Sequence, residues 1–244
     1  MKACALIFAG GTGSRMQSEK PKQFLEVDNR PIIVHTLDHF QKNENVNDIV
    51  VVCKEDWIDY LNDLISKYKL DKVKWVVPGG STGQLSIYNG LMKLKKELPT
   101  VEDTVVLIHD GVRPVINQKV INENIKTVQE KGTSVTVTPA IETVITIDDK
   151  GMIKDTVERA KCRMAKAPQC FWLKDIISVH EDAYAKGNTN MIDSATLMSS
   201  YGYKLHTVDG PSENLKITTP IDYYTFKTIY QILKENESFH VKED

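Results

Sequence analysis

Residues 3–16 have the sequence ACALIFAGGTGSRM, in which an apolar run ends at a turn that contains three glycines. The run Ala3–Phe8 is typical of a strand buried on both faces, and glycines let backbone N–H groups approach an anion closely. Arg15 lies in the turn, and Lys20 and Lys22 follow it, so positive charge gathers where a helix is expected to begin. The segment predicts a strand followed by a loop that holds a polyphosphate.

The spacing of the glycines differs from that of two common nucleotide-binding motifs. The last glycine of G-x-G-x-x-G would fall at Met16, and Arg15 stands where the Walker A pattern requires its second glycine. Neither a dinucleotide cofactor nor P-loop ATP chemistry is therefore favoured. Taken alone, the turn is equally compatible with a plain strand-to-helix connection whose basic residues are solvated.

The composition excludes several classes of protein. The chain has 244 residues, of which 41% are hydrophobic and 26% charged, and this suits one large globular domain. Its formal net charge of −2 gives no overall basic field for nucleic acid. The four cysteines lack C-x-x-C spacing, no apolar stretch reaches the ~18 residues of a membrane span, and no signal peptide is recognisable. We expect a cytoplasmic protein without nucleic-acid or membrane partners.

Apolar runs rich in Val and Ile alternate with amphipathic stretches in the first half of the chain. The expected strands are Ala3–Phe8, Asp48–Cys53, Val73–Val77 and Thr104–His109, and the expected helices are Ile32–Phe40, Asp56–Tyr68, Leu85–Leu98 and Ile116–Gln129. This order predicts an α/β fold, a Rossmann-like doubly wound and mostly parallel sheet. Ligands of such sheets bind beyond the carboxyl ends of the strands, where the glycine turn, residues 78–84 and residues 110–114 would meet.

The second half of the chain begins with a different pattern. Short strands are expected over Thr133–Pro139, Glu142–Ile147 and Met152–Val157. Residues 141–159 would then form a projecting β-hairpin arm, and because a lone hairpin is rarely stable in water we expect it to join two subunits into a homodimer. A last helix is expected over Asp222–Leu233. Residues 1–236 would form a single domain, with a charged tail over residues 237–244.

Six short motifs carry the chemistry. They are Ala9–Met16, Pro21–Phe24, Gly79-Gly80 with Ser86, His109–Pro114, Pro168-Gln169 and Asn214–Thr219. In order and spacing they resemble the cytidylyltransferases that act on ribitol 5-phosphate or on 2-C-methyl-D-erythritol 4-phosphate, and the resemblance spans nearly the whole chain. Four features look more like the ribitol-phosphate branch; they are Phe24–Glu26, Asp56-Trp57, Val112 and Asn214–Thr219.

The resemblance implies Mg²⁺-dependent transfer of a cytidylyl group from CTP to a sugar-alcohol phosphate, which yields a CDP-alditol and pyrophosphate. Such chemistry needs charge neutralisation and in-line positioning more than a covalent nucleophile. The implied catalytic residues are Arg15, Lys22 and Lys216, and the implied nucleotide-binding residues are Ala9, Gly10, Gly11, Gly13, Gly79, Gly80 and Ser86. The product would be a precursor of a cell-wall or capsule polymer.

Three further positions have roles implied by the same resemblance. Asp110 would hold the Mg²⁺ ion, although a carboxylate here could instead cap a turn. Thr143 and Arg159 would reach the acceptor from the arm of a partner subunit, where an arginine suits a phosphate. Arg113 fits a structural role better, bonding loop carbonyls under the site, and Ser86 without the resemblance would be an ordinary helix serine.

Three positions depart from the family pattern. Gly83 stands where an arginine is usual, Ala167 replaces the threonine before Pro-Gln, and Ile192 replaces a threonine or serine. The last two hydroxyls help to hold the acceptor in relatives. The departures indicate an acceptor that is neither methylerythritol phosphate nor ribitol phosphate, and another, ribitol-5-phosphate-like alditol phosphate is expected. The alternative is 2-C-methyl-D-erythritol 4-phosphate, the acceptor in isoprenoid synthesis.

A second motif points to another class of enzyme. Residues 79–83, GGSTG, match the G-x-S-x-G elbow of hydrolases, with Ser81 as the nucleophile between an expected strand and an expected helix. The residues that could complete a triad are His180, His206, Asp193 and Asp209. A hydrolase mechanism would give no function to the basic glycine turn, to Lys22 or to Lys216. A catalytically silent nucleotide-binding module is a third hypothesis.

Overall fold

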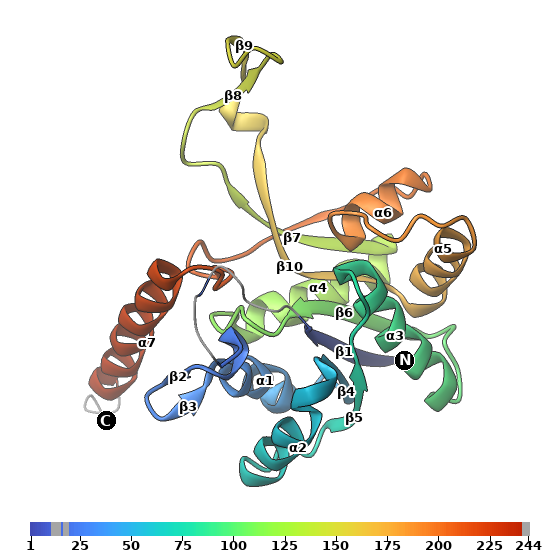
Figure 1. Ribbon diagram of the computed structural model, residues 1–244, viewed down its shortest axis with the longest axis vertical. Helices are drawn as coiled ribbons and strands as arrows, with labels where there is room; N and C mark the ends of the chain where they lie inside the picture. The colour runs from blue at the N-terminus through green and yellow to red at the C-terminus, as the bar shows by residue number, and fades with distance from the viewer. Residues whose placement is uncertain (11–15, 17–19, 241–244) are drawn as a thin grey trace.

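The computed structural model describes residues 1–10, 16 and 20–240 of the chain. Within this part, a seven-stranded central sheet has the order β11-β7-β10-β6-β1-β4-β5 (Figure 1). The strands are β1 (Lys2–Ala9), β4 (Asp48–Cys53), β5 (Val73–Pro78), β6 (Thr104–Asp110), β7 (Thr133–Pro139), β10 (Arg163–Trp172) and β11 (Thr207–Asp209). Parallel pairs join β6, β1, β4 and β5, whereas β10 runs antiparallel between β6 and β7. The expectation of a mostly parallel sheet is confirmed.

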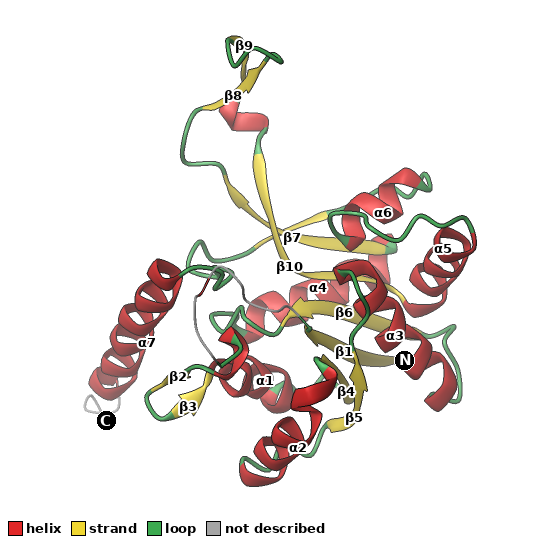
Figure 2. Ribbon diagram, in the orientation of Figure 1, coloured by secondary structure: helices red, strands yellow, loops and turns green. Residues whose placement is uncertain are grey.

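Helices cover both faces of this sheet (Figure 2). The main ones are α1 (Ile32–Lys42), α2 (Ile58–Lys67), α3 (Gly83–Glu97), α4 (Gln118–Lys131), α5 (Leu173–Ala185) and α6 (Ser194–Ser200). One buried cluster joins α1, α2 and α4 to one face of the sheet, and another joins α3, α5 and α6 to the opposite face. Burial on both faces explains why the central strands consist of Val, Ile, Leu and Ala with almost no alternation. The fold is doubly wound, as the sequence predicts.

Capping residues set two helix boundaries that hydrophobic periodicity misplaced by two residues. Helix α3 begins at Gly83 because the Thr82 hydroxyl accepts a hydrogen bond from the Leu85 N–H, at 3.1 Å. Helix α4 begins at Gln118 because the Asn117 side chain accepts from the Val120 N–H, at 2.9 Å. Strand β10, helices α5 and α6 and strand β11 were not predicted. Among the described helices, none has the length and the hydrophobicity needed to cross a membrane.

The arm is a separate two-stranded sheet of β8 (Val144–Ile147) and β9 (Ile153–Val157), and it projects from the body at the top of Figure 1. The projecting hairpin is therefore confirmed, with strands shorter by one or two residues than expected. Large apolar side chains are exposed on the arm and at its base; they are Ile141, Ile145, Ile147, Met152, Ile153 and Met164. Exposure of so much apolar surface on one element is typical of an interaction surface.

Helix α7 (Pro220–His240) extends beyond the expected Asp222–Leu233 and packs on one edge of the body. Its Phe226 lies in a small buried cluster with Val112 and Ile217. The Ile217 N–H donates to the Val112 carbonyl at 2.9 Å. Helix α7 thus fixes the segment that carries Lys216 against the loop that follows β6. The strands β2 (Glu26–Val27) and β3 (Arg30–Pro31) form a small hairpin beside it.

Candidate active site

The ends of β1 and β5 meet at one place, and glycines make the meeting close. A Cβ atom added to Gly10 would lie 3.3 Å from the Ser86 hydroxyl oxygen, and one added to Gly79 would lie 3.2 Å from it. At Gly80 an added Cβ would clash with the Leu85 side chain at 2.4 Å. Both turns therefore lie close to α3, tightly at Gly10 and Gly79 and too closely for a Cβ atom at Gly80 unless the backbone shifts. The predicted convergence of the glycine turn with residues 78–84 is confirmed at Gly10 and Gly79, and Ala9 precedes Gly10 at the end of β1.

The Ser86 hydroxyl is held in the turn before α3. Its Oγ accepts from the Gly80 N–H at 3.0 Å and donates to the Thr82 carbonyl at 2.9 Å. These bonds shape the turn around Gly79 and Gly80. The arrangement agrees with both interpretations of Ser86, as a helix serine and as a base-reading residue, so its contact with cytosine stays a prediction.

Lys22 opens the 3₁₀ turn Lys22–Phe24, and its neighbours fix that turn beside the end of β1. Gln23 is buried and donates from Nε2 to the Ala9 carbonyl at 2.7 Å, while Phe24 stacks on Trp57 with ring centroids 5.0 Å apart. The backbone of Lys22 is thereby tied to the strand that precedes the glycine turn. Three predicted site residues, Gly11, Gly13 and Arg15, lie outside the described residues.

Asp110 ends β6 and is the most strongly paired carboxylate of the site. Only 5% of the residue is exposed. Arg113 Nε donates to Oδ2 at 2.8 Å and Lys216 Nζ lies 2.5 Å from Oδ1. Burial favours the neutral acid, but the charges of Lys216 and Arg113 outweigh it and hold the pKa of Asp110 below its ordinary value. Asp110 is thus ionised at neutral pH and clamped between two cations.

Arg113 has the structural role that its position in the loop suggested. Its Nη1 donates to the Asn214 carbonyl at 2.9 Å, and the Asn214 Nδ2 donates to the Ala167 carbonyl at 2.8 Å. Three segments are joined in this way: the end of β6, the strand β10 and the segment before Lys216. Residues that are far apart in sequence are brought to one wall of the site.

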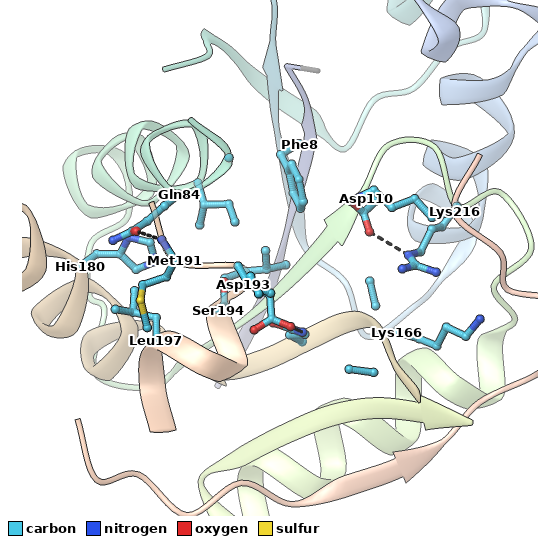
Figure 3. Close-up of a pocket in the computed structure, with 18 residues that line it drawn as sticks. Phe8, Gln84, Asp110, Lys166, His180, Met191, Asp193, Ser194, Leu197 and Lys216 are labelled. Atoms are coloured by element: carbon cyan, nitrogen blue, oxygen red, sulfur yellow. Dashed lines mark hydrogen bonds and ion pairs between the residues drawn. The ribbon is translucent and has the colours of Figure 1, made fainter. Parts of the chain in front are cut away.

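A cavity of about 280 Å³ opens beside Asp110 (Figure 3). The predicted positions that line it are Gly83, Asp110, Arg113, Ala167, Gln169, Ile192, Asp193 and Lys216. Ala167 is buried, whereas Ile192 is 91% exposed at the rim. A Cβ atom added at Gly83 would meet nothing within 4 Å, so no neighbour of this Cβ position explains why the usual arginine is absent.

Three other polar residues of this cavity were not predicted to line it, namely Lys166, His180 and Ser194, whereas Gln84 ends the loop 78–84 that was expected at the site. The Lys166 ammonium has no hydrogen bond or ion pair with any residue in the described part of the chain, and burial together with Arg113 lowers its pKa. The one feature of the sequence that pointed to Lys166 as a site residue is its place just before the Pro168-Gln169 motif. Nothing in the sequence marks Ser194, because its position follows from the packing of α3 against the loop before α6.

The hydrolase triad is not assembled. The strand–turn–helix of the elbow is present, but within the described residues no hydrogen bond joins Ser81 to a histidine. His206 contacts Thr133, with Nδ1 3.2 Å from the hydroxyl oxygen. Asp193 caps α6, accepting from the Thr196 N–H at 2.7 Å, and also accepts from Gln169 at 3.0 Å. Of the partners proposed for Ser81, His206 and Asp193 bond to other residues, and neither ring nitrogen of His180 has a hydrogen bond within the described residues.

Thr143 and Arg159 lie at the base of the arm and do not line the cavity of their own chain. Arg159 Nη1 donates to the Ile141 carbonyl at 3.0 Å, which braces the two sides of the arm. Figure 1 shows the arm pointing away from the body. A contact of these residues with the acceptor would therefore need a second chain, and it stays a prediction.

The sequence pattern of the 2-C-methyl-D-erythritol 4-phosphate cytidylyltransferase family matches residues 3–231. The chain belongs to this cytidylyltransferase family. As a member it is an enzyme that transfers a cytidylyl group from CTP to a sugar-alcohol phosphate, and this sets aside both the hydrolase and the silent nucleotide-binding module.

Curated relatives fall into two groups. The chain is 53% identical over 226 residues to "Ribitol-5-phosphate cytidylyltransferase" of Vibrio parahaemolyticus, covering 92% of this chain and 94% of the relative. It is 54% identical to the protein of the same name from Streptococcus agalactiae, covering 96% and 98%. The "2-C-methyl-D-erythritol 4-phosphate cytidylyltransferase" of Clostridium acetobutylicum is 36% identical, with coverage of 96% and 98%.

Solved structures agree with this family assignment. The crystal structure of 4-diphosphocytidyl-2C-methyl-D-erythritol synthase from Anaerococcus prevotii aligns with a TM-score of 0.80 at 29% identity, covering 94% of this chain and 96% of the other. The cytidylyltransferase fold is thus shared along nearly the whole chain.

Proposed function

We propose that this cytidylyltransferase uses ribitol 5-phosphate as its acceptor and produces CDP-ribitol, a precursor for cell-wall or capsule polymers. A phosphate oxygen of the acceptor attacks the α-phosphorus of CTP, and the bond from that phosphorus to the bridging oxygen breaks to release pyrophosphate. The observation that carries the choice of acceptor is the identity of 53–54% to enzymes named for ribitol 5-phosphate, against 36% for one named for methylerythritol phosphate. The four free cysteines fit a reducing cytoplasm.

The clamped carboxylate supports the reaction. Lys216 is 41% exposed at its side chain and contacts Asp110 through Oδ1 alone, so it can leave the carboxylate for an incoming phosphate. Arg113 would keep Asp110 in place through Oδ2. Lys22, fixed beside the end of β1, would meet the α-phosphate from the other side, with Arg15 and the glycine turn holding the rest of the triphosphate.

Mg²⁺ fits this donor set. The ion usually takes one or two protein carboxylates together with substrate phosphates and water, so a single buried carboxylate at the cavity is sufficient. Among the described residues no cluster of three acidic, histidine or cysteine side chains forms a complete cage. Asp110 would hold the ion once Lys216 has moved to phosphate. When bound, Mg²⁺ would neutralise charge on the phosphates and orient the α-phosphate for attack.

Ala167 and Ile192 offer no hydroxyl to the acceptor, so the choice of ribitol 5-phosphate rests on the named relatives and not on these two positions. A pyrophosphate-release assay with CTP and a panel of alditol phosphates tests the proposal. We expect kcat/KM for ribitol 5-phosphate to exceed that for 2-C-methyl-D-erythritol 4-phosphate by about tenfold or more, the value of one good polar contact. A preference for methylerythritol phosphate would restore the isoprenoid alternative.

We also propose that two chains form a homodimer in which each arm reaches the partner's cavity. The exposed apolar residues of the arm support this, as does the exposed Ile192 at the cavity rim. An apolar surface of this kind gains stability when a second surface covers it. Thr143 and Arg159 would then contact the acceptor phosphate of the other subunit.

Mixing two inactive variants tests the shared site. We expect Arg159→Ala and Lys22→Ala to be nearly inactive alone. After exchange of subunits the mixture should recover about a quarter of wild-type activity, because half of the dimers are mixed and each has one intact site. Sedimentation of each variant should show an unchanged dimer. Failure of the mixture to recover activity, although mixed dimers form, would place Arg159 and Lys22 of one chain in the same site.

A further inference from the structure

Two buried polar side chains of the cavity have no partner. His180 on α5 is 1% exposed, and within the described residues neither its Nδ1 nor its Nε2 has a hydrogen bond. Ser194 at the start of α6 is 3% exposed, and its hydroxyl has none either. Both line the cavity that contains Asp110 and Lys216. Since buried polar groups in proteins nearly always have partners, two unpaired groups on one cavity point to a ligand.

The two groups define the chemistry of that ligand. Burial lowers the pKa of His180 to about 4, so at neutral pH its ring is uncharged, with one N–H donor and one acceptor nitrogen. The Ser194 hydroxyl can also donate and accept. An anion would find no positive charge here, and a hydrocarbon would leave both groups unpaired. Hydroxyl groups match both.

One end of the cavity carries charged side chains, and the other end carries neutral polar ones. In Figure 3, Asp110 and Lys216 lie on one side, His180 and Leu197 on the other, with Asp193 and Ser194 between them. The first side offers the ammonium groups of Lys216 and Lys166, which suit a phosphate. The second side has neutral groups among apolar neighbours. A polyol phosphate has the same polarity, with charge at one end and hydroxyls along the chain.

We propose that His180 and Ser194 bind hydroxyl groups of the acceptor far from its phosphate, and that they set the length of polyol the enzyme prefers. The proposal rests on the proposed function, because it assumes an alditol phosphate as acceptor. His180 is a specificity residue placed by its helix and by Tyr88, whose ring lies nearly parallel to it at 6.4 Å. A bound water would satisfy the same atoms but would not distinguish acceptors of different length.

The loop before Ser194 is held in place from α3. Gln84 accepts at Oε1 from the Met191 N–H and donates from Nε2 to the Asn188 carbonyl, each at 2.7 Å. The Thr82 hydroxyl donates to the Thr189 carbonyl at 2.6 Å. Because these bonds fix residues 188–191, Ser194 stays directed at the cavity without a ligand, and the subsite is preformed.

The test compares His180→Phe and Ser194→Ala with wild type. Phenylalanine keeps the ring and removes both nitrogens. We expect kcat/KM for ribitol 5-phosphate to fall about 5- to 150-fold in each variant, while KM for CTP and inhibition by glycerol 3-phosphate, which is two carbons shorter, change less than about twofold. His180→Gln, which restores a donor and an acceptor, should recover part of the loss. Ser178→Ala, an exposed serine on the same helix outside the cavity, is the matched control.

Other outcomes overturn the inference. Equal weakening of ribitol 5-phosphate and glycerol 3-phosphate would mean a general structural role, and unchanged kcat/KM would mean no contact with the acceptor. If His180→Phe does not fold, Ser194→Ala decides by itself. If the wild-type enzyme prefers another alditol phosphate, the proposed acceptor is wrong, and the same variants measured with the preferred acceptor and a shorter homologue still decide the inference.

Discussion

Replacing Lys22 by alanine is expected to lower kcat by about 10²-fold or more while the affinity for CTP changes far less. The expectation follows from the place of Lys22 beside the end of β1, where Gln23 ties its backbone to the Ala9 carbonyl. In the proposed mechanism the Lys22 ammonium would meet charge that develops on the α-phosphate, so its loss would raise the barrier more than it weakens the bound ground state.

Single-turnover measurements with saturating CTP separate the two effects. Lys22→Arg keeps a positive charge and should retain more activity than Lys22→Ala. Lys93→Ala is a suitable control, because Lys93 lies on α3 and pairs with Glu97 at 2.7 Å. Near-normal turnover of Lys22→Ala would remove this residue from the mechanism.

The second large effect is expected for Asp110→Asn, which should abolish most activity and raise the Mg²⁺ concentration needed for the remainder. The structure adds an effect on stability. Asp110 is buried between Arg113 and Lys216, so the neutral side chain leaves Arg113 without its ionic partner, at a cost on the order of 3 kcal/mol in the free energy of unfolding. A sequence-only account, with Asp110 as a metal ligand and nothing more, would leave the apo melting temperature nearly unchanged.

Arg113→Gln separates the two roles of Asp110. It should lower the melting temperature to a similar extent while the Mg²⁺ requirement stays near that of wild type. If both variants shift the metal requirement equally, Asp110 acts by shaping the loop and not as a ligand. The ion pairs lower the pKa of Asp110, so its stabilisation is present above the ordinary value of 3.8 and is lost as the pH falls through the lower folded-state pKa.

Some strands and helices of the fold could be predicted from the hydrophobic pattern of the sequence, and others could not. The strands β1, β4 and β6 were predictable because both of their faces are buried, which gives uninterrupted apolar runs. Strand β10 was not predictable in this way. Its first residues, Arg163 and Met164, are exposed at the base of the arm, and Pro168 interrupts its run of apolar residues. Helix α6 has only seven residues, too few for a clear period.

The site divides in the same way. Asp110, Lys216, Gly79 and Ser86 stand in short motifs whose resemblance to a known family could be recognised. The contact between Asp110 and Lys216 could not be predicted from the sequence, because the two residues are far apart along the chain and only the fold brings them together. His180 entered the sequence argument as a member of a catalytic triad. Its actual position, unpaired at the wall of a cavity, follows from the way α5 covers the sheet.

The packing of α7 has a consequence for how the enzyme comes into being. Phe226 closes the small cluster with Val112 and Ile217, and this cluster presses the Lys216 segment onto the loop after β6. Translation reaches α7 only after all the strands of the central sheet. A nascent chain that has released its sheet but not this helix therefore lacks the packing that holds the Lys216 segment beside Asp110. We expect the cavity wall at Lys216 to form only late in synthesis.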